Sequence, residues 1–339
     1  MAQQKVVLSG MRSTGKLHLG HYFGTLKNWV ELQSEHDCYF FAADWHALTS
    51  DYEDPSAVTR NTVEALADWI AAGVDPERAV VFVQSMVPEH AELHLVLSML
   101  TPLGWLERVP TYKEQLREVE GRDLSTYGFL GYPVLQTADI ILYRAHLVPV
   151  GEDQASHLEI SREITRRFNS LYAPVFPEPK ALFTHTPKVP GIDGRKMSKS
   201  YGNAINLSDP PEEIRRKCSA MFTDPTRLRR KDPGHPETCN LYAFHRLVSA
   251  PELQERVARE CRAAEIGCVD DKKLIAEQLI SFLEPFQARR SELLRDPGAL
   301  LEILRRGSSR ARERAQETMQ QVREALGMDY DRLLAGPGR

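Results

Sequence analysis

The stretch that most constrains the fold of this chain is Gly15–Gly24, which reads Gly-Lys-Leu-His-Leu-Gly-His-Tyr-Phe-Gly. It follows an apolar run over 6–10 that stops at a glycine, and apolar residues then recur at helical spacing through Val30. This pattern predicts a strand, a tight turn and a helix. The free amide groups of a helix N-terminus bind anions, and His18 and His21 lie at that end. The two histidines are therefore interpreted either as a polyphosphate site or as ordinary turn residues.

Strands and helices alternate along the next part of the chain. Residues 38–43 form an apolar run typical of a strand buried on both faces, a helical pattern runs from 55 to 73, and 79–83 is again strand-like. This order predicts an α/β fold with right-handed crossovers and a doubly wound parallel sheet. In such a sheet ligands bind beyond the carboxyl ends of the strands, where His18, His21, Asp44 and His46 are expected. His46 is equally compatible with a simple turn residue.

A helix predicted over 132–142 carries a polar stripe on an otherwise apolar body. Pro133 opens it, and Tyr132, Gln136 and Asp139 then fall at positions i, i+4 and i+7. A carboxylate in such surroundings needs a donor, because burying it unpaired costs several kcal/mol. The stripe suits a small zwitterionic substrate, and an internal hydrogen bond to a neighbouring loop is the structural alternative.

The remaining segments of this half are more varied. A helix is predicted over 89–100, and 110–131 is expected to be an insertion without regular pattern. A short strand over 148–150 ends in a glycine turn and opens a further helix, whereas 173–194 is expected to be an irregular connection rich in proline and glycine. That connection leads to 196–200, Lys-Met-Ser-Lys-Ser, which is either a functional motif or a solvated basic loop.

Charge and composition limit the class of protein. The formal net charge of the 339 residues is −4, which argues against a general nucleic-acid coating protein and leaves local basic patches for any polynucleotide. We expect no signal peptide, no membrane span and a cytoplasmic location. From about 206 onward the pattern is helical over 211–222, 274–286 and 298–326. Two groups of arginines there are either solvated faces or contacts to the phosphates of a nucleic acid: Arg227, Arg229 and Arg230, and Arg305, Arg306, Arg310, Arg312 and Arg314.

Taken together, the His-Leu-Gly-His and Lys-Met-Ser-Lys-Ser motifs resemble the two signatures of class I aminoacyl-tRNA synthetases. Nearly the whole chain is similar to the bacterial tryptophanyl-tRNA synthetase family, including 8–10, 43–48, 132–139, 148–154 and 194–203. The resemblance implies a Rossmann-type catalytic domain over 1–205 and an α-helical anticodon-binding domain over 206–339, where a C-terminal helix can return to the catalytic core. It implies ATP, Mg²⁺, L-tryptophan and tRNA(Trp) as ligands, a ligase activity and a homodimer.

The resemblance also assigns roles to individual residues. It places Thr14, His18 and His21 on the ATP phosphates, Lys196 and Lys199 on the leaving pyrophosphate, and Gly20 against the adenine. The full ATP site comprises Arg12, Ser13, Thr14, Gly20, His21, Gly151, Glu152, Asp153, Lys196, Met197, Ser198 and Lys199. The tryptophan site comprises Leu8, His46, Tyr132, Gln136, Asp139, Val148, Val150 and Gln154, with Tyr132 and Gln154 on the ammonium group and Asp139 on the indole N–H. Gln136 departs from the family, since many members carry methionine there.

Adenylate formation needs positioning and charge neutralisation more than an acid–base pair, which suits histidine and lysine donors. Three other functions remain open at this point. One is a nucleotidyltransferase that acts on a small metabolite, and another is a non-enzymatic sensor of tRNA or tryptophan. The third is the tyrosine enzyme of the same class, because a buried carboxylate accepts a phenol proton as readily as an indole one.

Three cysteines near the end of the chain form a separate pattern. The spacing of Cys239, Cys261 and Cys268 resembles a four-cysteine iron–sulfur site of some tryptophan enzymes, but the fourth position is Asp271. Four thiolates are the usual ligands of a [4Fe–4S] cluster, and a carboxylate is a poorer ligand there. We therefore expect no cluster, and expect the three thiols to pack as small buried hydrophobes.

Overall fold

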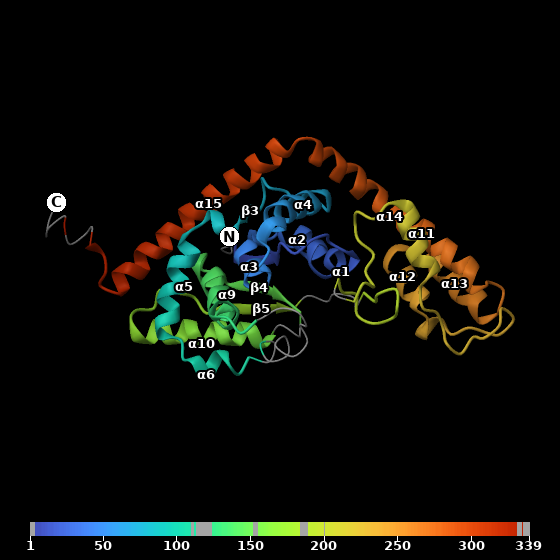
Figure 1. Ribbon diagram of the computed structural model, residues 1–339, viewed down its shortest axis with the longest axis horizontal. Coiled ribbons are helices and arrows are strands. Elements are labelled where there is room, and N and C mark those ends of the chain that lie inside the picture. Colours follow the sequence, from blue (N-terminus) through green and yellow to red (C-terminus); the bar gives the residue numbers. More distant parts are fainter. Residues whose placement is uncertain are drawn as a thin grey trace.

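The computed structural model describes residues 4–109, 112, 124–151, 155–183, 189–199, 201–330 and 334. A parallel sheet with helices on both faces forms one end of the molecule, and a group of helices forms the other (Figure 1). Within these residues no helix is both long and apolar enough to cross a bilayer. Much of the insertion expected over 110–131 lies outside the described residues, apart from 112 and 124–131.

The sheet has five parallel strands in the order β3-β2-β1-β4-β5. The strands are β1 (Val6–Arg12), β2 (Asp37–Ala43), β3 (Val80–Val83), β4 (Leu147–Val150) and β5 (Lys180–Phe183). The chain moves outward from β1 to β3 and then returns to the other side of β1, so the order reverses between β1 and β4. The predicted doubly wound fold is confirmed, and its ligand crevice is expected at this switch point.

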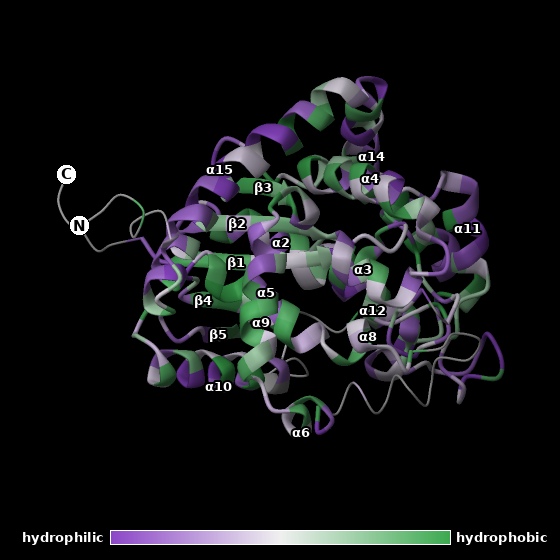
Figure 2. Ribbon diagram, turned by 60° about the vertical axis from the view of Figure 1, so that its left-hand side comes forward, coloured by the Kyte–Doolittle hydropathy of each residue, from purple (hydrophilic) through white to green (hydrophobic). Residues whose placement is uncertain are grey.

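Helices cover the two faces of the sheet and bury two separate hydrophobic clusters. The helices of this part are α1 (Leu19–His21), α2 (Lys27–Leu32), α3 (Asp44–Asp51), α4 (Val58–Ala71), α5 (Glu89–Leu100), α6 (Leu103–Leu106), α8 (Tyr127–Leu130), α9 (Tyr132–Leu142) and α10 (Ala155–Leu171). A π-helical turn over Tyr22–Leu26 joins α1 to α2, so the predicted helix is continuous with one irregular turn. Apolar residues of α9 stand out between the strands and α10 when the ribbon is coloured by hydropathy (Figure 2).

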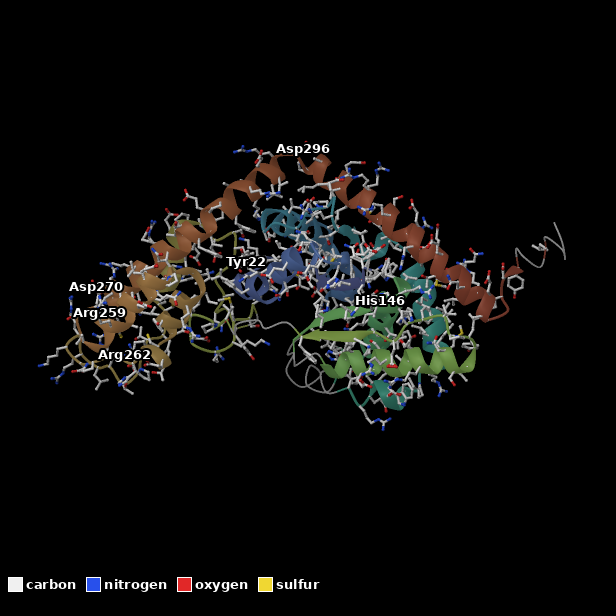
Figure 3. All side chains as sticks on the ribbon, turned by 180° about the vertical axis from the view of Figure 1, so that it is seen from behind. Tyr22, His146, Arg259, Arg262, Asp270 and Asp296 are labelled. Atoms are coloured by element: carbon white, nitrogen blue, oxygen red, sulfur yellow. The ribbon has the colours of Figure 1, made fainter. Side chains whose placement is uncertain are left out.

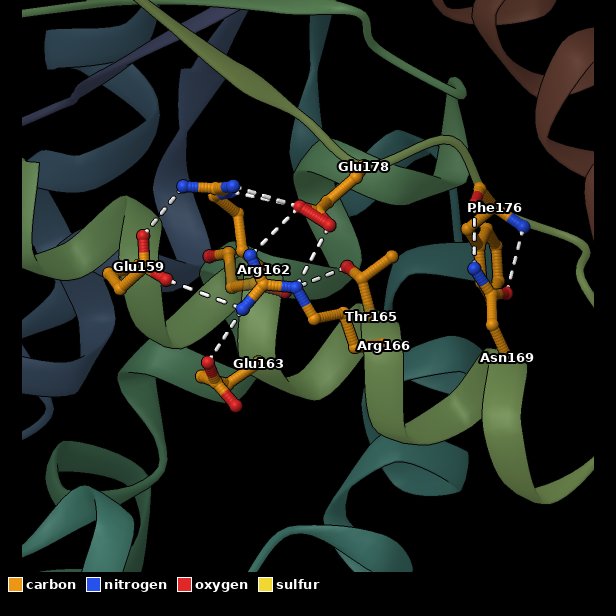
Figure 4. A network of polar contacts seen from close by, with 9 residues as sticks. Glu159, Arg162, Glu163, Thr165, Arg166, Asn169, Phe176 and Glu178 are labelled. Carbon is orange, nitrogen blue, oxygen red and sulfur yellow. Dashed lines mark hydrogen bonds and ion pairs between the residues drawn. The ribbon is translucent and has the colours of Figure 1, made fainter.

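The connection expected to be irregular over 173–194 contains strand β5, so that prediction is wrong for 180–183. Only four residues form this edge strand, and two of them are exposed, so its sequence carries no strand period that stands out. The segment before it is tied to α10, where Arg162 and Arg166 both pair with Glu178 (Figure 4). This network fixes the outer edge of the sheet.

The C-terminal part is helical as predicted. Its helices are α11 (Pro211–Ser219), α12 (Asn240–Val248), α13 (Pro251–Arg262), α14 (Cys268–Arg295) and α15 (Pro297–Ala325). Asp296 caps α15 by accepting from the amide of Ala299 at 3.0 Å, and it marks the apex where the two long helices meet (Figure 3). From this apex α15 runs back along the part that contains the sheet (Figure 1).

Candidate functional site

The two histidines after β1 cap the helix that follows them. Nδ1 of His18 accepts from the amide of Gly20 at 3.1 Å, and Nδ1 of His21 accepts from the amide of His18 at 3.1 Å. Their ring centroids lie 3.8 Å apart. A backbone amide can only donate, so both Nδ1 atoms are unprotonated acceptors and each neutral ring carries its proton on Nε2.

Burial keeps both rings neutral. It lowers the pKa of His18 to about 4, assisted by the charge of Lys199. Burial also lowers the pKa of His21 to about 2, assisted by His18 and Lys199. At neutral pH the pair therefore offers two Nε2–H donors without adding positive charge.

Gly20 is needed inside this cap. A Cβ atom at position 20 would lie 2.9 Å from the His18 ring. The glycine therefore lets the His18 ring close onto the first turn of the helix.

The lysine motif reaches the same turn from the other half of the chain. Nζ of Lys199 donates to the carbonyl oxygens of Thr14 at 2.9 Å and Gly15 at 3.0 Å. Burial lowers the pKa of Lys199 to about 8, with Arg12 adding to the shift and Asp68 opposing it. The backbone completes the link, because Leu19 donates to Ile205 and Leu207 donates to Leu17. The structure thus brings the two motifs together.

Asn203 organises the loop that carries the lysines. Its Oδ1 accepts from the amide of Ser198 at 2.8 Å, and its Nδ2 donates to Asp193 at 2.8 Å and to the carbonyl of Lys196 at 3.2 Å. Asn203 and Met197 are both buried, whereas Lys196, which directly precedes Met197, is exposed. The loop is therefore anchored by its neutral residues.

Other residues of the predicted ATP site are less uniform. Arg12 is exposed at the end of β1 and donates to Ser50, whereas the hydroxyl of Ser13 is buried and accepts from Thr62 at 2.7 Å. Ser13 therefore faces the interior. Gly151 follows β4 at the same edge, and Glu152, Asp153, Gln154 and Ser200 lie outside the described residues.

Asp139 is the centre of the second half of the site. It is 1% exposed on α9, and its Oδ1 accepts from Nε2 of Gln84 at 2.7 Å and from Nδ1 of His90 at 2.6 Å. Its Oδ2 accepts from Nε2 of His46 at 2.8 Å. Burial alone would raise the pKa of Asp139, but the hydrogen bonds from His46 and His90 outweigh it and hold the pKa below its ordinary value. Asp139 is therefore a buried carboxylate whose Oδ2 retains a second lone pair for an acceptor role.

The other residues of the predicted tryptophan site lie around α9. The hydroxyl of Tyr132 is 3.0 Å from Nε2 of His157 on α10. Leu8 and Val148 are buried in one hydrophobic cluster, and Val150 packs against it. Gln136 is half-buried on the same helix.

Comparison with known proteins agrees with this geometry. The family profile described as tRNA synthetases class I (W and Y) matches residues 2–284. The tryptophan–tRNA ligase of Thermotoga maritima is 50% identical, and the match covers 96% of this chain and 99% of the relative. The tryptophan–tRNA ligase of Aquifex aeolicus is 45% identical, and the match covers 95% of this chain and 99% of the relative. A crystal structure of the tryptophanyl-tRNA synthetase of Campylobacter jejuni complexed with ADP and tryptophan has a TM-score of 0.88 at 35% identity, over 95% of this chain and 99% of its own.

The chain belongs to the class I tryptophanyl-tRNA synthetases. It is a tryptophan–tRNA ligase with a Rossmann-type sheet and a helical C-terminal region.

Sequence reasoning missed two donors of this synthetase site, Gln84 and His90. Gln84 directly follows β3, so the rule that placed His46 at a strand end applied to it equally. His90 gave no such signal, because a histidine in the first turn of a helix has many ordinary uses. The fully buried His90 also contacts the hydroxyl of Tyr143 at 2.7 Å through Nε2.

Two of the three cysteines of the pattern lie beside an arginine. Nη1 of Arg227 lies 3.7 Å from Sγ of Cys261 and 4.0 Å from Sγ of Cys268, while its Nη2 donates to the carbonyls of Arg230 and Ile266. The carboxylate of Asp271 is held by Nε2 of His245 at 2.9 Å. Burial raises the pKa of the Cys261 thiol, which the charge of Arg227 opposes. A cation between two sulfurs and a carboxylate bound elsewhere do not fit a four-ligand iron–sulfur site.

Proposed function

We propose that this synthetase uses the histidine and lysine motifs to bind MgATP and Asp139 to recognise the indole of L-tryptophan. The tryptophan carboxylate attacks the α-phosphorus of ATP, which forms an acyl–phosphate bond and breaks the bond to pyrophosphate. A ribose hydroxyl at the end of tRNA(Trp) then attacks the acyl carbon and releases AMP. The observation that carries this proposal is the contact of Lys199 with the turn that presents His18 and His21.

On the ATP side, the chain supplies donors where negative charge develops. The Nε2–H groups of His18 and His21 are directed by the cap that occupies both Nδ1 atoms. Lys199 and Lys196 supply positive charge as pyrophosphate leaves. Donors held in place before the reaction stabilise a transition state without reorganisation, and losing one typically costs about 2.7–4 kcal/mol.

On the tryptophan side, Oδ2 of Asp139 accepts the indole N–H beside His46. The position is fixed because three donors already hold the carboxylate. A buried carboxylate accepts a phenol as well, so this contact alone does not separate tryptophan from tyrosine. The relatives at 45–50% identity favour tryptophan.

Substitution of Asp139 tests this assignment. Asp139→Ala removes the indole acceptor, so the KM for tryptophan is expected to rise about thirtyfold or more while the KM for ATP changes little, since a lost charged acceptor in a buried site costs about 2–5 kcal/mol. Steady-state pyrophosphate exchange measures both constants. An unchanged KM for tryptophan contradicts the assignment.

We also propose a homodimer formed through an apolar strip on α5 and α6. Leu95 and Met99 lie one turn apart on α5, and Leu103 begins α6 after the break at Thr101 and Pro102. These three side chains are 56%, 77% and 62% exposed. Large apolar side chains exposed on consecutive helices are typical of interaction surfaces, and a second copy offers the same side chains. Met99→Glu is expected to convert a dimer into a monomer in light scattering after size exclusion, and wild-type protein that is monomeric at micromolar concentration contradicts the proposal.

For tRNA, we propose Arg229 and Arg230 as phosphate contacts in preference to the arginines of α15. Arg230 pairs with Asp270 at 3.2 Å, but both side chains are at least half exposed, so a phosphate can replace the carboxylate. On α15, Arg306 pairs with Glu77 and Arg312 pairs with Glu89, so these side chains hold the helix to the catalytic part. Such a ligase would act in the cytoplasm, where its tRNA is charged.

We further propose that the protein folds without an iron–sulfur cluster, because Arg227 and the His245–Asp271 pair occupy the places that iron and its fourth ligand need.

A further inference from the structure

Helix α15 covers the edge of the sheet along strand β3. A Cβ atom at Gly307 would lie 1.8 Å from the carbonyl oxygen of Val81, so the helix backbone rests directly on the strand. Oγ of Ser308 accepts from the amide of Val83 at 3.3 Å, at the last residue of β3. The helix thus satisfies an edge amide that would otherwise have no strand beside it.

The residue after this contact belongs to the tryptophan site. Gln84 follows Val83 directly and is fully buried, and its Nε2 donates to Oδ1 of Asp139 at 2.7 Å. Ser308 therefore fixes the backbone at the base of Gln84.

One turn later, α15 makes a second contact of the same kind. Nε of Arg312 donates to Oε1 of Glu89 at 2.9 Å, and the Glu89 side chain is only 6% exposed. Its Oε2 has no hydrogen-bond partner among the residues that the structure describes, so the ion pair with Arg312 compensates this buried charge. The next residue is His90, whose Nδ1 contacts the same Oδ1 of Asp139 at 2.6 Å.

We propose that α15 is a positioning element for tryptophan recognition. Ser308 and Arg312 hold Val83 and Glu89, the residues directly before Gln84 and His90. Gln84 and His90 in turn saturate Oδ1 of Asp139, and this leaves Oδ2 as the oxygen that meets the substrate. Neither Ser308 nor Arg312 touches tryptophan, so both are positioning residues. The inference rests on the proposed role of Asp139, and it couples the C-terminal helix to amino-acid selection.

The chain offers a matched control for Arg312. Arg323 lies on the same helix and pairs with Glu92 of α5 at 2.6 Å, but Glu92 is 39% exposed and lies three residues beyond Glu89. Arg312→Ala and Arg323→Ala thus each remove one ion pair between α15 and α5. Only the first removes support behind His90.

The experiment measures kcat and KM for tryptophan and for ATP, and kcat/KM for tyrosine, in full-length variants by pyrophosphate exchange. Arg312→Ala is expected to raise the KM for tryptophan about tenfold, at the lower end of the losses known for partners that orient metal-binding side chains, with the KM for ATP within twofold of wild type. Arg312→Lys should restore most of the loss, and Arg323→Ala should match wild type. Ser308→Ala is also expected to raise the KM for tryptophan, and this variant serves as the test if Arg312→Ala does not fold.

Asp139→Ala is measured in parallel. If it raises the KM for tryptophan while Arg312→Ala and Ser308→Ala stay within twofold of wild type, α15 is only a structural support and this inference is wrong. An equal rise in Arg323→Ala also overturns it, because general loosening of the helix then accounts for the effect. If Asp139→Ala itself leaves the KM unchanged, the proposed role of Asp139 fails first and this inference falls with it.

Discussion

Nζ of Lys199 lies 2.9 Å from the carbonyl oxygen of Thr14, a residue 185 positions earlier in the chain. The contact joins the lysine loop to the turn that leads into the His18 cap. Since both motifs are fixed to the same backbone turn, a ligand there meets a donor set that is assembled in advance. We expect the lysine to exchange these carbonyl oxygens for phosphate oxygens when ATP binds.

Replacing this lysine tests its part in the chemistry. Lys199→Ala is expected to lower the rate of adenylate formation by about two to three decades, with much less effect on the affinity for tryptophan, because its charge is needed as pyrophosphate departs. Pre-steady-state measurement of adenylate formation gives the rate, and Lys27→Ala, an exposed lysine on α2, is the control. A rate within twofold of wild type would exclude this role.

The low pKa of Lys199 predicts a pH dependence. Its pKa is about 8, so the free enzyme loses the charged form as pH rises through 8, and kcat/KM for ATP should fall there. Bound phosphates favour the charged form, so the corresponding fall in kcat should lie at higher pH. His18 and His21, with pKa values of about 4 and about 2, should add no inflection between pH 5.5 and about 7.5.

The lowered pKa of Lys199 also makes the stability of the fold depend on pH. The folded chain binds fewer protons than the unfolded chain between the two pKa values of Lys199, about 8 and 10.5, so this group makes the free energy of unfolding rise with pH across that window.

A profile of kcat/KM for ATP against pH tests the predicted fall near pH 8. The Lys199→Arg variant keeps its positive charge at this pH, so any activity that it retains should show no fall near pH 8.

The close approach of α15 to β3 predicts a stability effect at one glycine. Gly307→Ala is expected to lower the free energy of unfolding by about 1–3 kcal/mol, because the added Cβ meets the backbone of Val81 and the helix must move. Gly104→Ala on α6 is the control, since a Cβ there meets nothing within 4 Å. Denaturant titration compares the two variants, and equal midpoints for Gly307→Ala and wild type would contradict the packing described for α15.

The contacts around the cysteines predict a colourless protein. After anaerobic purification we expect little bound iron, because Arg227 lies between Cys261 and Cys268 and Asp271 is paired with His245. Iron and acid-labile sulfide analysis and a visible absorption spectrum measure this. Near-stoichiometric iron with a broad absorption band is the contrary result.

The sequence allowed the sheet and the edge that carries the site to be predicted, because these depend on local pattern. Apolar runs mark β1 to β3, and each is followed directly by polar residues such as Asp44. The tautomers of His18 and His21 were not predictable, since they depend on which backbone amides reach Nδ1. Strand β5 was missed because its four residues, two of them exposed and two half-buried, follow a proline-rich segment and carry little periodic signal.

The polar network around Asp139 shows the other limit. The need for a donor followed from the burial of a carboxylate. Its donors are Gln84, His46 and His90, which only the tertiary fold brings to one point. The arginines of α15 were interpreted as solvated faces or tRNA contacts, whereas Arg312 is an ion-pair partner of a buried glutamate. Pairing over more than two hundred residues leaves no local trace in the sequence.

The most direct test of the account is ATP–pyrophosphate exchange by the purified protein with each of the twenty amino acids in turn. Exchange is expected to depend on L-tryptophan, and a site that hydrogen-bonds its substrate can reject an analogue without the donor, such as phenylalanine, by about 10⁴–10⁵, a magnitude known from a related synthetase. Tyrosine is also expected to be a poor substrate. Exchange that is faster with tyrosine than with tryptophan would contradict the assignment of Asp139 to the indole.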